Sequence, residues 1–238
     1  MPEALTTERV RGRLDNLLLD SYRDLASIMK GVALAAATFV GLEILISWST
    51  AWPRILPWMA SLLASIVSYM TWGRGVLLAN SRGSLWDTVL PFLIGIDEFC
   101  LFAILAPRPE SPDVWRWWFA VLAGHGLTAA LLTHNRVRNT DLQRDFAAEL
   151  RQLGGEYQAW IRDDRFGAGV VSLLALASLV VAVVVLPRYI TGTGYIVWYW
   201  ILTVPFIGVF LVVISRADCQ RRRIDEVVYA PTAVTAGS

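Results

Sequence analysis

Charged residues are scarce in this sequence: Asp, Glu, Lys and Arg make up 17% of its 238 positions, whereas hydrophobic residues make up 55%. A soluble globular domain carries about 25% charged residues, so the composition argues against a soluble domain. The apolar residues fall in blocks of roughly 20, the length at which a helix crosses about 30 Å of hydrocarbon. The sequence therefore predicts an all-α integral membrane protein.

Cysteine and net charge are also low. Cys100 falls within a predicted span and Cys219 follows the last one, so we expect no pairing between them and no disulfide framework. The formal net charge of +1 leaves no basic stripe for a nucleic-acid partner. The first 30 residues are polar and charged, so we expect no cleavable signal peptide before the first span.

Motifs of known chemistry are missing as well. His125 and His134, the only histidines, lie on opposite faces of one predicted helix, a spacing that cannot clamp a haem. The sequence has no cysteine cluster, phosphate-binding glycine loop or hydrolase motif. We expect no cofactor and no dedicated metal site, and a metal held by Asp97, Glu98 and His125 stays open only as an alternative. An enzyme has the least support, because no nucleophile–base pair is identifiable.

Six apolar blocks are long enough to be transmembrane helices. The segments that connect these blocks fall alternately on the two sides of the membrane. The side that includes both chain ends carries 17 Lys and Arg residues, and the other side carries 4. The positive-inside rule places the richer side in the cytoplasm, which predicts a multi-pass protein with both termini cytoplasmic. The predicted spans are about 31–50, 55–73, 86–106, 114–134, 166–187 and 194–215.

Two polar segments with helical apolar spacing precede pairs of spans, residues 1–30 and residues 135–165. They are predicted to be cytoplasmic amphipathic helices that pack on each other or lie along the inner membrane surface. The alternative is a gate or a contact with another protein, for which 139–163 is the candidate segment. The rest of the chain divides into spans one to four (31–134), spans five and six (166–215) and a cytoplasmic tail (216–238).

Two acids, Asp97 and Glu98, stand in the middle of the third block. A carboxylate at this depth costs roughly +2.5 to +3.5 kcal/mol on insertion scales, and such residues usually face a bundle interior or a cavity. Successive helical residues lie about 100° apart, so the two acids point in different directions. Glu98 shares one helical stripe with Asp87, Pro91, Ile94, Leu101 and Leu105.

Polar residues in other spans are candidate partners for these acids. His125 lies near the middle of the fourth span, and Glu43 lies in the outer half of the first. Arg74 and Asp87 are expected at a similar depth near the inner boundary, as an interfacial ion pair or gate. The second span carries a predicted polar lining made of Ser61, Ser65, Ser68 and Tyr69.

Two functions remain open from these residues. Intramembrane ionisable groups usually mark an ion or proton path, which favours a channel or transporter for protons or cations built on Asp97, Glu98 and His125. Each helix has few polar positions, so a homo-oligomer lined by spans two to four is expected. The same acids also suit protonated groups that hydrogen-bond helices together. The chain would then be a membrane scaffold, assembly factor or regulator whose cytoplasmic helices bind a partner.

Overall fold

The computed structural model describes residues 7–78, 85–106, 112–142, 155–189 and 195–228, and within these ranges the chain is helical without any strand. The all-α prediction is confirmed. Four short elements, α2 (Trp48–Ala51), η1 (Trp52–Arg54), the π-helical η3 (Val181–Val185) and α8 (Leu186–Tyr189), accompany six long helices. The long helices are α1 (Thr7–Ile46), α3 (Ile55–Leu78), α4 (Leu85–Ala103), α5 (Pro112–Leu142), α7 (Gly155–Val180) and α9 (Tyr195–Val228).

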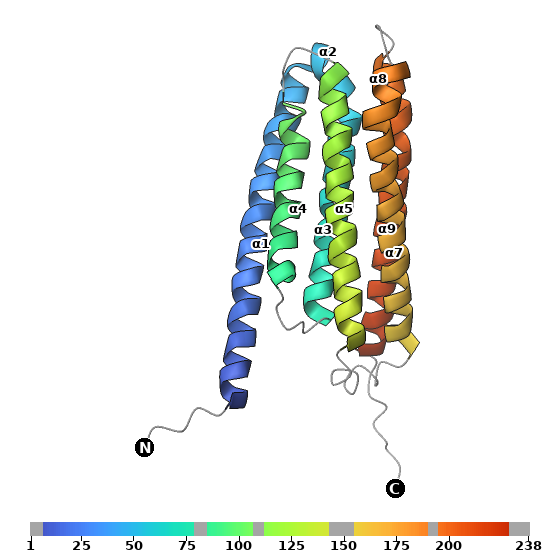
Figure 1. Cartoon of the computed structure of the whole chain (residues 1–238). Coiled ribbons are helices and arrows are strands. Elements are labelled where there is room, and N and C mark those ends of the chain that lie inside the picture. Colours follow the sequence, from blue (N-terminus) through green and yellow to red (C-terminus); the bar gives the residue numbers. More distant parts are fainter. Residues whose placement is uncertain (1–6, 79–84, 107–111, 143–154, 190–194, 229–238) are drawn as a thin grey trace.

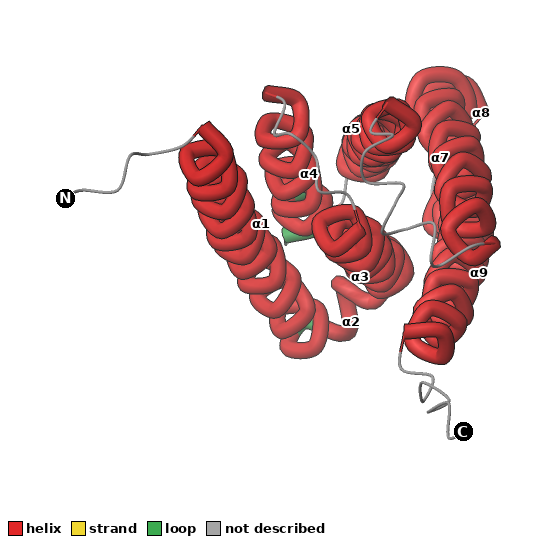
Figure 2. The backbone as a smooth tube through the Cα atoms, turned by 90° about the horizontal axis from the view of Figure 1, so that it is seen from below, coloured by secondary structure: helices red, strands yellow, loops and turns green. Residues whose placement is uncertain are grey.

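The long helices stand side by side and run alternately in opposite directions (Figure 1). α1 packs on α4, α4 on α5, α5 on α7, and α3 on α9. Seen along the bundle, α1 and α4 lie on one side, α3 and α5 in the middle, and α7 and α9 on the other side (Figure 2). The start of α1 and the end of α9 share one end of the bundle, which we name the terminal end; the opposite end is the distal end.

Within the described ranges, three helices are long and apolar enough to cross a membrane. Their candidate spans are Ser27–Ile46 in α1, Arg162–Val185 in α7 with η3, and Tyr195–Cys219 in α9. Only 22% of each apolar window is buried inside the molecule. Large aliphatic side chains therefore face outward, as in a helix surrounded by lipid. These helices support the assignment to membrane proteins.

The predicted boundaries between polar segments and spans do not coincide with helix ends. α1 runs without a break from Thr7 to Ile46, through the predicted boundary at residue 30. Residues 155–165 of the second polar segment form the first turns of α7, and 143–154 lie outside the described residues. α9 continues to Val228, beyond the predicted end at 215. No proline occurs at these positions, and a change in side-chain polarity alone does not end a helix.

The apolar core fills the distal half of the bundle. Trp118 is completely buried there and donates a hydrogen bond from Nε1 to Ser61 Oγ at 3.0 Å. The Trp115 ring stacks on Tyr199 with 4.5 Å between ring centroids. Other large apolar core residues with no exposed surface are Leu101, Phe102, Leu105 and Phe119.

The terminal half of the bundle contains a second apolar cluster and a cavity. Among the described side chains, this cluster consists of Leu90, Ile94 and Leu132, with Ala129 packed against them. A cavity of about 760 Å³ lies in the same part of the molecule, between α3, α5, α7 and α9. The described side chains of the distal half therefore form a closed apolar core, whereas those of the terminal half surround a cavity.

Candidate functional site

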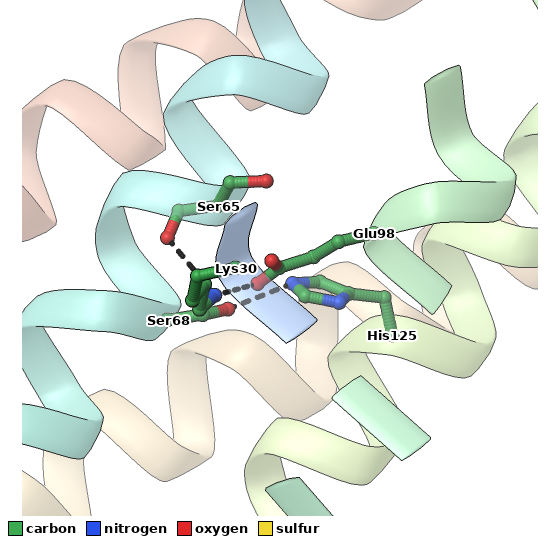
Figure 3. A network of polar contacts seen from close by, with 5 residues as sticks. All are labelled: Lys30, Ser65, Ser68, Glu98 and His125. Atoms are coloured by element: carbon green, nitrogen blue, oxygen red, sulfur yellow. Dashed lines mark hydrogen bonds and ion pairs between the residues drawn. The ribbon is translucent and has the colours of Figure 1, made fainter. Parts of the chain in front are cut away.

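A buried ion pair joins α1 to α4 where the sealed and open halves meet. Glu98 has no exposed surface, and its Oε1 accepts a hydrogen bond from the Lys30 ammonium (Figure 3). Lys30 Nζ also donates to the backbone oxygen of Ser65 on α3, at 3.4 Å. The Lys30 side chain keeps 17% of its surface exposed. The ammonium thus links α1 to both α3 and α4.

Electrostatics explains why these two charges lie together. Moving one ion out of water costs several kcal/mol, and the attraction between opposite charges recovers this only when the geometry is good and the remaining polar atoms are satisfied. Within the described part of the chain, Glu98 Oε2 has no hydrogen-bond partner. Lys30 therefore neutralises the charge of the carboxylate, but the protein does not supply hydrogen bonds to both of its oxygens.

A second polar pair lies beside the first. His125 of α5 and Ser68 of α3 share a hydrogen bond of 3.0 Å between Nε2 and Oγ, and only 4% and 7% of their surfaces are exposed. Figure 3 shows both pairs in one view, with side chains contributed by α1, α3, α4 and α5. The sequence suggested His125 or Ser68 as the partner of Glu98. Lys30 forms the ion pair with Glu98. Ser68 also interacts with the Glu98 side chain, and it shares its hydrogen bond of 3.0 Å with His125.

Asp97 has a different environment from its neighbour. Its Oδ2 accepts a hydrogen bond of 3.2 Å from Thr128 Oγ1 on α5, and the same hydroxyl lies 3.0 Å from the backbone oxygen of Gly124. The side chain is half-buried, whereas Glu98 is completely enclosed. The two acids point in different directions, as expected for consecutive residues of a helix.

The helical stripe through Glu98 faces the bundle interior. Ile94 is 5% exposed, and Leu101 and Leu105 have no exposed surface. Pro91 is half-buried on the same side of α4. The side chains of Asp87 and its predicted partner Arg74 lie outside the described residues, so this ion pair stays a prediction.

The remaining candidate residues are divided between the site and other parts of the bundle. Ser65 is buried beside Lys30, whereas Ser61 belongs to the distal core with Trp118. Tyr69 does not share this buried lining, because its side chain is 58% exposed. Glu43 lies thirteen residues beyond Lys30 on α1, about 20 Å along the helix. It therefore does not contact the site.

Lys30 is the site residue that the sequence analysis missed. It was assigned to the polar segment before the first span, as one of the charges that set orientation. Its rarity could have identified it, because Lys30 is the only lysine and the other 20 basic residues are arginine. Without Lys30 the orienting bias is still 16 to 4, so the topology prediction does not depend on it.

The site has no arrangement typical of a metal centre. Among the described residues, no group of three or more His, Cys, Asp and Glu side chains lies close enough together to hold a metal ion. Asp97, Glu98 and His125 are therefore not gathered around one point. The position next to Glu98 that a cation would take holds the Lys30 ammonium.

Comparison with protein-family models, with curated proteins and with solved structures gave no match for this chain. Function must therefore be inferred from the site itself.

The ion pair predicts strong coupling between Lys30 and Glu98. Lys30→Met or Glu98→Met alone leaves one buried charge without its partner and should destabilise the protein by about 3–5 kcal/mol. The two changes together should bring stability back to within about 1 kcal/mol of wild type, because both charges are then removed. Chemical unfolding in detergent micelles measures all four proteins.

Arg222→Met is the control, because Arg222 pairs with Asp218 at the surface and should contribute little. Independent, additive effects of the two single changes would show that the charges do not interact in the folded protein.

Proposed function

We propose that this chain is a multi-pass membrane transporter for protons or other cations, and that Glu98 with Lys30 is its ion-binding site. The supporting observation is the position of the pair between two unlike halves of the bundle. Distally, completely buried Leu101, Phe102 and Trp118 close the path. The Lys30 side chain is partly exposed, and Ser68 and His125 line the cavity of the terminal half. Access from one side only is the property expected of a carrier in one of its two states.

Protons fit this site better than metal cations. A metal cation would have to displace the Lys30 ammonium and lose its own water in an enclosed position. A proton needs no additional space, and a carboxyl group without full hydrogen bonding can accept it.

The proposed cycle has two states. A proton from water adds to the Glu98 carboxylate, which becomes neutral and no longer holds Lys30. The charged ammonium then moves along its flexible stem toward water at the terminal end, the direction in which side chains of α1 point. Opening of the distal core releases the proton on the other side, and Lys30 returns to the carboxylate. His125 and Asp97 are assigned supporting roles in proton exchange.

A non-transport scaffold or regulator is the second candidate, and one observation favours it. The first turns of α1 project beyond the other helices at the terminal end (Figure 1). A projecting helix is suited to binding a cytoplasmic protein, with 139–163 as a further predicted contact segment. In this case the Lys30–Glu98 pair only fastens α1 to the bundle.

Reconstituted liposomes with an internal pH indicator separate the two candidates. Wild type should move protons under an imposed gradient. The double variant Lys30→Met with Glu98→Met keeps its fold yet should lose flux by about a hundredfold or more, because no group remains to carry the proton.

Arg222→Met serves as the matched control and should transport at the wild-type rate. If wild type moves neither protons nor common cations, or if the folded double variant transports normally, the transport proposal is wrong and the scaffold candidate remains.

The topology in this proposal has six spans with both termini in the cytoplasm. Cys219 is exposed near the terminal end of α9, and Cys100 is half-buried. In a Cys100→Ala background, a membrane-impermeant thiol reagent should label Cys219 in inverted membrane vesicles and leave it unlabelled in intact cells. Labelling in intact cells would place the terminal end outside and contradict the proposed orientation.

A further inference from the structure

Glu98 is enclosed by protein, although the proposed cycle requires a proton from water to reach it. Its side chain has no exposed surface, and it is not among the residues that line the cavity of the terminal half. His125 and Ser68 do line this cavity. Two polar side chains therefore stand between the cavity and the carboxylate.

These side chains form a continuous series of polar contacts that ends at Glu98. His125 Nε2 and Ser68 Oγ lie 3.0 Å apart, and the Ser68 side chain also interacts with Glu98. Figure 3 shows all three side chains at the site. A hydroxyl group can accept one hydrogen bond while it donates another. Ser68 is therefore able to connect the imidazole to the carboxylate.

The partners of His125 indicate which ring nitrogen carries the hydrogen. The imidazole also interacts with the backbone oxygen of Ala64, which lies one turn before Ser68 on the same face of α3. Nδ1 has no hydrogen-bond partner among the described residues, so the contact with Ala64 belongs to Nε2. Because a carbonyl oxygen only accepts hydrogen bonds, Nε2 bears the hydrogen. The lone pair of Nδ1 is then available to accept a proton.

The charges around Glu98 set the direction of the other hydrogen bond. Lys30 from α1 and Asp97 from the same helix are the charged groups that act on this carboxylate among the described residues. In its ion pair with Lys30, Glu98 is ionised and only accepts hydrogen bonds. The Ser68 hydroxyl therefore donates to Glu98 and accepts from the imidazole. Both hydrogen bonds point from the cavity toward the carboxylate.

We propose that His125 and Ser68 form a proton relay from the cavity to Glu98. This inference rests on the proposed function, for which it supplies the entry route. A hydronium ion in the cavity gives its proton to Nδ1 and becomes water. The hydrogen on Nε2 moves to Ser68 Oγ, and the Ser68 hydroxyl gives its own proton to the carboxylate. Imidazole and hydroxyl stay neutral, and Glu98 becomes a neutral carboxyl group.

The relay returns to its starting state without a further reactant. The imidazole loses the proton on Nδ1 to water in the cavity and gains one from water on Nε2. The Ser68 hydroxyl then turns back toward Glu98, which has released its proton on the distal side. A histidine suits this step because its two ring nitrogens exchange roles as donor and acceptor.

Ser68 can be changed without altering the two ends of the relay. Ser68→Ala removes the bridging hydroxyl and leaves the ion pair and the imidazole in place, whereas Ser68→Thr retains a hydroxyl. Alanine also has a higher helix propensity than serine, so Ser68→Ala should fold. Ser178→Ala is the matched control. Ser178 is completely buried and lines the same cavity, but its hydroxyl donates to the backbone oxygen of Leu174 in its own helix, at 2.8 Å.

The experiment measures how fast the Glu98 carboxylate is protonated, by time-resolved infrared spectroscopy of the full-length protein in detergent micelles. Light releases protons from a caged acid, and the carboxyl signal that is lost in Glu98→Gln identifies the group. Wild type, Ser68→Thr and Ser178→Ala should protonate at similar rates. Ser68→Ala should be slower by about tenfold or more, because transfer through a positioned side chain contributes roughly 10²–10⁴-fold. It should still reach the wild-type amplitude at a pH that protonates Glu98 fully.

His125→Gln supplies a second variant of the relay. It should slow protonation as Ser68→Ala does. The double variant Ser68→Ala with His125→Gln should be no slower than either single variant, because both residues act in series on one path. Effects that multiply in the double variant would contradict a single path.

The outcomes separate the relay from the transport proposal. A wild-type rate in Ser68→Ala would overturn the relay and leave the transport proposal standing, with the proton entering beside Lys30. A Glu98 carboxylate that is protonated in none of the proteins would overturn both. Rates that follow the relay, together with no flux in liposomes, would support the relay and contradict transport alone.

Discussion

The Glu98 carboxylate lies away from water, and the arrangement of four helices follows from this constraint. A buried carboxylate requires a counter-charge. Lys30 supplies that charge from α1, the helix at the edge of the bundle (Figure 2). A shift of α1 by one helical turn, about 5.4 Å, would separate the two charges. The pair therefore fixes the register of α1 against α4 as well as neutralising the acid, and structural and functional roles meet in the same two residues.

The difference between the two halves of the bundle supports a role for this pair in proton transfer, in addition to its role in holding α1 on α4. Aromatic and aliphatic side chains seal the distal half, and hydrogen bonds such as Trp118 to Ser61 satisfy its few polar groups. The terminal half holds the cavity and a smaller apolar cluster. An ionisable group at the boundary between these two halves is where a transported proton would have to pass from one side of the membrane to the other.

Much of the fold could be predicted from the sequence, because block length and helical spacing are local properties. The helical class and the inward stripe of Ile94, Glu98 and Leu101 follow from them. The partner of Glu98 could not be predicted, because α1 and α4 are far apart in the sequence and nothing local shows that they pack together. Tyr69 was grouped with Ser68 from proximity along the chain, yet one residue rotates the side chain by about 100°, out of the buried face.

The direction of the Lys30 side chain could not be predicted for a related reason. The polarity of the side chains changes near Lys30, where the sequence predicts the limit of the first span. The structure continues α1 through this point and turns Lys30 inward, toward the carboxylate. A lone charge at such a boundary has two possible directions, and only the neighbouring helix decides between them.

The most direct test of the account is a solid-state NMR distance measurement in lipid bilayers. Because the chain has a single lysine, a ¹⁵N label on lysine side chains gives one ammonium signal, and ¹³C-labelled glutamate carboxyls supply the second spin. In wild type, the glutamate carboxyl carbon should strongly dephase the ammonium signal, which corresponds to a contact within about 4 Å. In Glu98→Gln this dephasing should disappear while the ammonium signal remains. An undephased ammonium signal in wild type, as for a lysine in water at the membrane boundary, would contradict the central claim.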